Sequence, residues 1–383
     1  MLTNADLVEL TKWRRMMHQF PEVSGAERET AARVVQALRA MNPDQIVTGL
    51  GGHGVAAVFN GAADGPTVMF RAELDALPIT EISTADHQST IPGTAHLCGH
   101  EGHMTWLMGL ARLVARRRPA RGRVVLMFQP AEEDGSGAAA VVADPAYAAI
   151  HPDWAFGMHN MPGVPFGQAW LVSGTICCAS VGMKIVLTGK TAHAAWPQTG
   201  VSPASALAAL IPALTALGAV GPIGPEYRLV TVTHALLGVP AFGIAPGGAE
   251  IWATLRTRDD APMADLRRDA EVLARVQAAK AGLGVDITYH DDFAATVNHP
   301  DATDHLTSAL EALALPHCAG DLPTRSSEDF GRFGAGQTKL AMVMLGAGEA
   351  YAALHNPDYD FPDDLIPLGV KVFHRVMTDI LGE

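Results

Sequence analysis

The sequence has little of what defines several large classes of protein. Four cysteines in 383 residues are too few for a disulfide framework, so reduced thiols are expected. No stretch reaches the roughly 18 consecutive apolar residues that a membrane helix needs. The N-terminus mixes polar and apolar residues and does not resemble a signal peptide. We therefore expect a cytoplasmic protein with no membrane partner.

Basic residues are also scarce. The chain has 27 Lys and Arg against 40 Asp and Glu, which gives a net charge of −13. A nucleic-acid-binding protein normally carries the opposite sign, so no nucleic-acid partner is expected. The one basic run, residues 116–118, is interpreted as the solvated end of a helix, where cations offset the helix dipole.

The pattern of apolar residues in the two outer parts of the chain predicts an α/β domain. Continuous or alternating apolar runs are typical of strands and alternate with helical periodicity. We expect an α/β/α catalytic domain with a mainly parallel sheet, formed by residues 1–179 and 294–383. Its expected strands are 56–59, 68–70, 124–128, 154–158 and 340–345, and its expected helices include 6–18, 26–41, 305–313 and 368–381.

The middle of the chain has a different pattern, which predicts an inserted domain over residues 180–293. The expected elements follow the order β-α-β-β-α-β, which is typical of a ferredoxin-like unit. Its strands are expected at 181–187, 228–234, 250–256 and 285–289, and its helices at 203–217 and 263–281.

The strongest chemical signal is the segment His-Leu-Cys-Gly-His-Glu-Gly-His at 96–103. Thiolate and imidazole are preferred ligands of zinc-like divalent ions. Cys98 and His100 are separated by one glycine, so an extended loop could aim both at one ion. A turn with buried histidines is the alternative, but three histidines and a cysteine within eight residues favour a metal site.

Acidic and histidine residues follow other expected strands. Glu132 and Glu133 come after the apolar run 124–128, and active sites of open α/β sheets lie at the carboxyl ends of strands. A metal would neutralise these acids and let one ligate while its neighbour acts as general base on water. A solvated acidic loop is an equally good explanation. His159 and His355 could add two imidazoles, although each alone is more typical of an ordinary core or loop residue.

Three familiar nucleotide and hydrolase signatures are either absent or in the wrong context. Gly49, Gly51 and Gly54 match G-x-G-x-x-G, but a strand pattern follows instead of a helix, so we interpret them as a glycine turn. No Walker lysine motif and no G-x-S-x-G are present.

The ordered motifs along almost the whole chain resemble the M20 metallopeptidases. The resemblance is to the aminoacylase/carboxypeptidase subgroup, which includes hippurate hydrolases and hydrolases of indoleacetate–amino acid conjugates. It is carried by MHQFPEVSGAE (17–27), RAELDALPI (71–79), HLCGHEGH (96–103), FQPAEEDGSGA (128–138), GMHNMPG (157–163), GKTAHAAWP (189–197), SEDFGRF (327–333) and LHNPDYDFPDD (354–364).

The resemblance implies a role for each matching residue. The metal-ligand positions of a centre with one or two divalent ions (zinc, manganese, cobalt or nickel) match Cys98, His100, Glu133, His159 and His355. Glu132 matches the general base, and Asp75 matches a carboxylate that holds a ligand histidine.

The family also implies functions for the inserted domain, which would move as a lid and form a homodimer. His193 matches a histidine that stabilises the oxyanion, often in the partner's active site. Arg256 matches an arginine that can hold a substrate carboxylate, although a surface charge at a strand end explains it equally well.

These features predict a metal-dependent amidohydrolase of N-acyl amino acids or related conjugates. A dipeptidase, a hydrolytic deaminase of an amino-substituted aromatic acid, a catalytically silent metal-stabilised binding protein and a structural or regulatory dimer are the alternatives. Two residues depart from the family pattern: Glu101 replaces an aspartate, and Gly243 replaces an asparagine expected near the substrate. The usual substrate is therefore the least secure part of the prediction.

Overall fold

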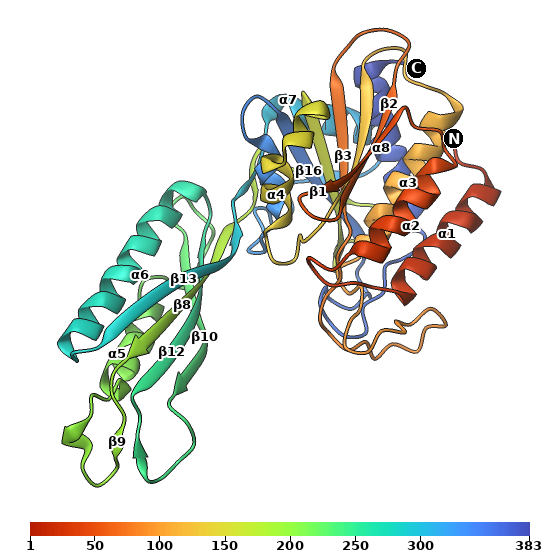
Figure 1. Ribbon diagram of the computed structural model, residues 1–383. Helices are drawn as coiled ribbons and strands as arrows, with labels where there is room; N and C mark the ends of the chain where they lie inside the picture. The colour runs from red at the N-terminus through yellow and green to blue at the C-terminus, as the bar shows by residue number, and fades with distance from the viewer. The chain divides into compact units, whose positions relative to one another are not determined.

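The computed structural model describes residues 1–383, and the chain divides into two compact units. Unit 1 consists of Met1–Ile176, Thr296–Leu322 and Asp329–Glu383, and unit 2 consists of Cys177–Ala295 and Pro323–Glu328 (Figure 1). The segment 323–328 lies outside the range expected for the inserted domain.

Unit 1 is built on an eight-stranded sheet with the order β1-β2-β4-β3-β5-β16-β6-β15. Its four central strands, β4, β3, β5 and β16, are parallel to one another, and antiparallel pairs flank them on both sides. The predicted mainly parallel sheet is thus confirmed. The strands are β1 Gln45–Leu50, β2 Gly54–Asn60, β3 Thr67–Glu73, β4 Arg123–Gln129, β5 Trp154–Pro162, β6 Ala169–Trp170, β15 His317–Cys318 and β16 Lys339–Gly348.

Helices cover both faces of this sheet. One face packs against α1, α2, α3, α7 and α8 through the main apolar core, and α4 with two 3-10 segments contacts the other face. Phe70 of β3 and Phe373 of α8 join the layers, with ring centroids 4.9 Å apart. The helices are α1 Asn4–Gln19, α2 Arg28–Arg39, α3 His100–Arg116, α4 Gly137–Ala143, α7 Pro300–Ala312 and α8 Leu365–Leu381, and the 3-10 segments are Pro145–Ala149 and Asp329–Gly334.

The parallel core brings distant motifs to one edge of the sheet. Strand β4 is apolar and buried over Val124–Phe128 because both of its faces are covered. In register, Glu73 at the end of β3 is paired with Gln129 at the end of β4, and β5 lies on the other side of β3. The segments that follow these strands therefore leave the sheet at the same edge.

Unit 2 is a four-stranded antiparallel sheet with two helices on one face, and its strand order is β10-β12-β8-β13. Alternate residues of β12, such as Ile251 and Leu255, are buried against α5 and α6. The predicted β-α-β-β-α-β order is confirmed. The elements are β8 Ala179–Thr188, α5 Ala204–Thr215, β10 Arg228–Leu237, β12 Gly248–Thr257, α6 Asp260–Lys280 and β13 Gly284–Phe293, with short segments β9 Ala192–His193, Pro197–Thr199 and β11 Ile244–Ala245.

Some elements were not expected from the sequence. Strand β1 pairs antiparallel with β2 across the glycine turn, where Gly51 and Gly52 have positive φ angles of 58° and 119°. Two short strands, β7 Gly174–Cys177 and β14 Thr296–Asn298, lie where the chain passes from one unit to the other. None of the helices is both long and apolar enough to cross a bilayer.

Candidate metal centre

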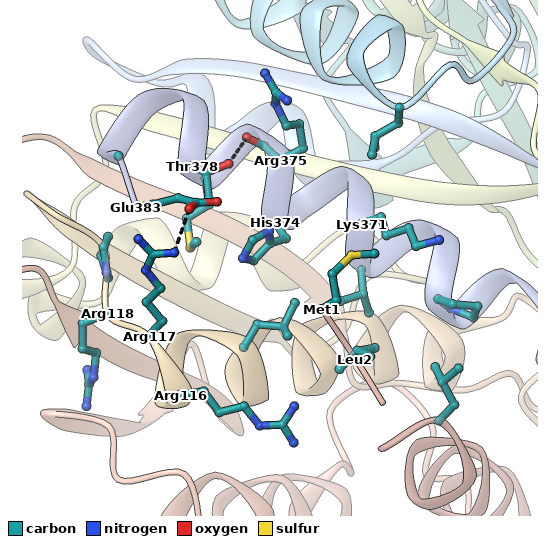
Figure 2. A pocket seen from close by; sticks show the side chains of 18 residues that line it. Met1, Leu2, Arg116, Arg117, Arg118, Lys371, His374, Arg375, Thr378 and Glu383 are labelled. Atoms are coloured by element: carbon teal, nitrogen blue, oxygen red, sulfur yellow. Dashed lines mark hydrogen bonds and ion pairs between the residues drawn. The ribbon is translucent and has the colours of Figure 1, made fainter. Parts of the chain in front are cut away.

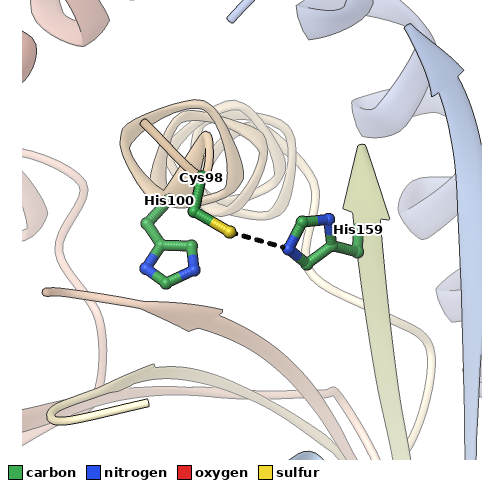
Figure 3. Close-up of side chains that lie close together, drawn as sticks. All are labelled: Cys98, His100 and His159. Carbon is green, nitrogen blue, oxygen red and sulfur yellow. Dashed lines mark hydrogen bonds between the residues drawn. The ribbon is translucent and has the colours of Figure 1, made fainter. Parts of the chain in front are cut away.

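Cys98 and His100 lie where a loop enters α3. Gly99 between them has a φ of 93°, and a Cβ at this position would lie 2.3 Å from Asn160 Oδ1, so the turn requires glycine. His159 projects from β5 toward this turn, and its Nε2 lies 3.4 Å from Cys98 Sγ (Figure 3). One potential ligand atom from each of Cys98, His100 and His159 lies within 4.8 Å of the others.

The acidic loop after β4 lies against the same histidine. His100 Nε2 is 3.7 Å from Glu132 Oε2 and 3.8 Å from Glu133 Oε1. Glu133 Oε2 is in turn 3.6 Å from His355 Nε2. The structure therefore brings all five predicted ligands and the predicted base into one place. We refer to Cys98, His100, Glu133, His159 and His355 as the candidate metal cluster, and their role as ligands stays a prediction.

One residue of this cluster and one residue near it have left-handed backbone conformations. Ala131, directly before Glu132, has a φ of 49°, and His355 itself has a φ of 66°. This conformation costs about 1–2 kcal/mol for a residue with a Cβ, and such strain is concentrated at functional sites. The His355 amide donates to the Leu97 carbonyl at 2.8 Å, which ties its segment to the loop that carries Cys98.

Hydrogen bonds orient both buried imidazoles. His100 Nδ1 donates to the Asp75 backbone carbonyl at 2.9 Å, and His159 Nδ1 donates to the Asn160 carbonyl at 2.7 Å. In each ring Nε2 is thereby directed at the cluster. The Asp75 carboxylate lies 3.5 Å from His100 Nδ1 and accepts the backbone N–H of Glu133 at 2.9 Å. Asp75 thus contacts both the histidine and the acidic loop.

The electrostatics of the cluster favour an added positive charge. Burial and the nearby Glu133 carboxylate raise the pKa of the Cys98 thiol well above its ordinary value. Burial alone would lower the pKa of His100, but Cys98 and Asp75 outweigh it and raise that pKa well above normal. Burial lowers the pKa of His159 well below its ordinary value. The groups around His100 therefore stabilise a cation there, while His159 offers a neutral nitrogen.

These residues fit a divalent metal ion. His100 Nε2 is buried and makes no hydrogen bond, and an unsatisfied buried polar atom normally costs free energy. One thiol, three imidazoles and a carboxylate are the donor types that zinc and neighbouring transition metals bind. A coordinated ion would both satisfy this nitrogen, which has no hydrogen-bond partner, and neutralise the nearby carboxylates.

A second set of charged side chains lies beside the same loop, and we name it the Arg14 cluster: Arg14, His18, Glu81, Glu101 and Asp360. Glu101 Oε1 accepts from His18 Nδ1 at 2.8 Å and from Arg14 Nη1 at 3.3 Å. The side chain of the unusual Glu101 thus hydrogen-bonds within this cluster and is directed at Arg14 and His18. Sequence reasoning missed Arg14 and His18, although both lie just before the matched MHQFPE segment or within it.

Another buried set supports the site from within the sheet. His103 Nδ1 donates to Glu73 Oε2 at 2.5 Å, and His103 Nε2 is 2.5 Å from Asn160 Oδ1. Arg71 forms ion pairs with Glu73 and with Asp329. Glu73 and Asn160 were not predicted; the only signal was their place inside motifs chosen for Asp75 and His159.

The two remaining predicted residues belong to unit 2. His193 is exposed in β9, which pairs with β11, and its Nδ1 accepts the Ala195 amide at 3.1 Å. Arg256 in β12 donates through Nη1 to the Arg325 carbonyl and to Ser327 Oγ, each at 2.9 Å. Neither the oxyanion role of His193 nor the carboxylate role of Arg256 is tested by these contacts.

A separate hollow of about 490 Å³ lies between the end of α3 and α8 (Figure 2). It is near residues 116–118, and α3 is a 17-residue helix with His100 at its other end. At 1.5 Å per residue the hollow is therefore about 25 Å from the candidate metal cluster. Its cations are largely paired with acids, as Arg116 is with Asp6 and Arg117 with Glu383.

Known proteins are similar to this chain in sequence and in fold. IAA-amino acid hydrolase ILR1-like 2 of Arabidopsis thaliana is 29% identical, over 98% of this chain and 85% of that protein. N-acetylcysteine deacetylase of Bacillus subtilis is 32% identical, over 71% of this chain and 72% of its own. The crystal structure of the Bacillus subtilis YXEP protein, described as a dinuclear metal binding peptidase from the M20 family, has a TM-score of 0.82 with 24% identity and covers 99% of both chains.

The family model described as Peptidase family M20/M25/M40 matches residues 69–379, which include the whole candidate metal cluster. The chain therefore belongs to this family and is a metal-dependent hydrolase.

Proposed function

We propose that this protein hydrolyses the amide bond of N-acyl amino acids or related conjugates. The observation that carries the proposal is the position of His100 Nε2, which makes no hydrogen bond and lies within 3.8 Å of both Glu132 and Glu133. The two relatives named above, an amino acid conjugate hydrolase and an N-acetyl amino acid deacetylase, support the same class of substrate.

In this proposal the candidate metal cluster holds one or two divalent ions, with zinc, manganese, cobalt and nickel as candidates. When bound, the metal supplies Lewis-acid chemistry, polarising the scissile carbonyl and lowering the pKa of water. The remaining steps belong to the side chains. Glu132 accepts the water proton and delivers it to the leaving amine. Asp75 keeps His100 in one orientation through its carbonyl and carboxylate.

Unit 2 has a part in the proposal through His193 and Arg256, which would stabilise the oxyanion and hold a substrate carboxylate. A lid role and a homodimer formed through residues 180–293 also stay predictions, as does the cytoplasmic location. The exposed loop around Gly243 carries no side-chain amide, so the acyl group that this enzyme prefers is expected to differ from that of relatives with asparagine there.

The substrate class can be tested directly. Metal-stripped protein would be reconstituted separately with zinc, manganese, cobalt or nickel and incubated with N-acetyl, N-benzoyl and indoleacetyl amino acids and with dipeptides. Metal-dependent release of free amine from an acylated amino acid supports the proposal. Release from dipeptides alone would favour the dipeptidase, and ammonia from an aminobenzoate would favour the deaminase.

The variant Glu132→Gln separates an enzyme from a binding protein. Its side chain has the same shape but cannot accept the proton, so turnover is expected to fall by orders of magnitude, about 10²-fold or more. Metal content and thermal stability should stay unchanged. Unchanged turnover in Glu132→Gln would rule out this residue as the base.

A further inference from the structure

Residues 22–27 form a short connection between α1 and α2 that contacts the loops of the candidate metal centre. The Glu22 carbonyl accepts the Ala76 amide at 2.9 Å, and Ser24 Oγ donates to Asp75 Oδ2 at 2.7 Å. None of these residues belongs to the candidate metal cluster, so the segment acts on the site only through its neighbours.

Glu27 is the residue of this connection that reaches deepest. It is fully buried and stands at the N-cap position of α2, yet its side chain makes no capping hydrogen bond to that helix. Instead, Oε1 accepts the Ala131 amide and the Gly25 amide, both at 2.8 Å. Its other oxygen, Oε2, makes no hydrogen bond. Burying a carboxylate with one oxygen unsatisfied costs free energy, and Glu27 does not recover that cost by capping its own helix.

The partner of Glu27 is the strained residue that precedes the proposed base. Ala131 is held in its left-handed conformation from both sides, because its amide donates to Glu27 and its carbonyl accepts the Gly137 amide at 2.9 Å. Gly137 is required there, since a Cβ would lie 1.6 Å from the Pro130 carbonyl oxygen. Two residues later, the Glu133 amide donates to Asp75. The backbone on each side of Glu132 is thus anchored to a buried carboxylate.

We propose that Glu27 is a positioning residue that holds Ala131 in the left-handed conformation and so aims the Glu132 carboxylate at the reacting water. This inference rests on the proposed function, in which Glu132 is the general base. Glu27 itself touches neither metal ligands nor substrate. The proposed effect of Glu27 depends on the length of its side chain, because its contact with Ala131 is a single hydrogen bond from the Ala131 backbone amide.

The test compares two conservative variants of Glu27, one that changes only the charge of the side chain and one that changes only its length. Glu27→Gln keeps the length and an oxygen acceptor, so its turnover should stay within a few-fold of the wild type. Glu27→Asp keeps the charge but is one methylene too short to reach the Ala131 amide. A misplacement of about 1 Å at a reacting group can cost about 10²-fold, so kcat of Glu27→Asp should fall by up to that factor with KM little changed.

Glu22→Asp is the matched control. The Glu22 carboxylate accepts the Thr30 amide and hydroxyl at 2.7 and 2.8 Å, so it also anchors the start of α2 but has no contact with residues 131–133. We expect a similar loss in melting temperature and no loss in kcat. In a Glu132→Gln background, Glu27→Asp should cause no further loss of kcat, because the proposed general base that Glu27 positions is already absent.

Amide hydrogen exchange gives a readout that does not need activity. In Glu27→Asp the peptide that contains residues 131–135 should exchange faster, while peptides of α8 stay unchanged. Faster exchange in a protein that hydrolyses no amide in the panel would overturn the proposed function and leave the positioning contact standing. Wild-type kcat and unchanged exchange in Glu27→Asp, or equal kcat losses in Glu27→Asp and Glu22→Asp, would overturn the inference about Glu27.

Discussion

The Arg14 cluster and the candidate metal cluster flank the segment 96–101, and they differ in how their charges are neutralised. The Arg14 cluster contains its own cations: Arg14 pairs with Glu101 and Asp360, and His18 pairs with Glu81 and Glu101. The candidate metal cluster contains no arginine or lysine, and His100 Nε2 has no hydrogen-bond partner.

This difference indicates that the candidate metal cluster, and not the Arg14 cluster, is suited to binding an added metal ion. His18, Glu101 and Asp360 also lie close enough together to be considered as metal ligands. There the Arg14 guanidinium already lies between the two carboxylates, so a metal ion would have to displace it. Proximity of donors is therefore not sufficient, and the absence of an arginine or lysine distinguishes the candidate metal cluster from the Arg14 cluster.

Removing the metal should have the largest effect of all. Chelation is expected to abolish turnover and to leave the Arg14 cluster intact, because its carboxylates are paired with Arg14 and His18 and need no ion. A ligand present at 1,000 times its Kd stabilises the folded state by about 4 kcal/mol, so the stripped protein should also melt at a lower temperature. Turnover before and after readdition of each metal is the measurement, and full activity in verified metal-free protein would contradict it.

Breaking the Arg14 cluster should be costly to stability. Arg14→Met leaves Glu101 buried without its guanidinium partner, and removal of one member of a buried ion pair costs about 3–5 kcal/mol. Urea denaturation of metal-free protein measures this. Arg15→Met is the control on the same helix, since Arg15 is half-exposed and pairs with Asp363 at the surface; it should cost less than about 1 kcal/mol. Equal costs for both variants would show that the cluster is not neutralised internally.

Stability should also depend on pH through His18. Burial alone would lower the pKa of His18, but hydrogen bonds with Glu101 and Glu81 outweigh it and raise the pKa from 6.5 to about 9. A raised histidine pKa means that the stabilisation is complete below pH 6.5 and is lost as pH rises to about 9. The loss should be at most about 3 kcal/mol.

The unfolding free energy of wild type and His18→Gln at pH 6.5, 7.5 and 9 measures this effect. The difference between the two proteins should shrink as pH rises, and His317→Gln, at an exposed histidine, should track the wild type. A constant difference across this range would mean that His18 is not charged in the folded protein.

The smallest predicted change concerns a single ligand. Cys98→Ser replaces a soft thiolate with a weaker hydroxyl donor, so metal affinity should fall at least about tenfold, or 1.4 kcal/mol. Competition with a chromogenic chelator measures it. Because the thiol makes no ion pair, the stability of the metal-free protein should hardly change. Unchanged metal affinity would remove Cys98 from the ligand set.

Local sequence patterns predicted much of the fold. The buried strand β4 is a run of apolar residues, and the helices of both units show clear periodicity, because burial on one face or both leaves a regular signal. Strands β1, β6 and β15 gave no such signal. They are short or lie near the edges of the sheet, where few side chains are buried.

The candidate site was predictable in part for a similar reason. Cys98, His100 and Glu133 stand in dense motifs of donor types, which can be recognised one segment at a time. Glu27 contacts Ala131 and Arg14 contacts Glu101, and each partner is about 90 or more positions away in the chain. Nothing near them in the sequence indicates those partners, so their role could not be found there.

The sequence by itself determined the residue types: the donors, the acids after the apolar strands, and the alternation that forms each unit. Only the tertiary structure decided which nitrogen of each histidine faces the cluster, which acid has an arginine beside it, and which backbone is strained. The physical reason is that charge compensation and hydrogen bonding act over a few ångströms in space, and chain folding alone brings those atoms together.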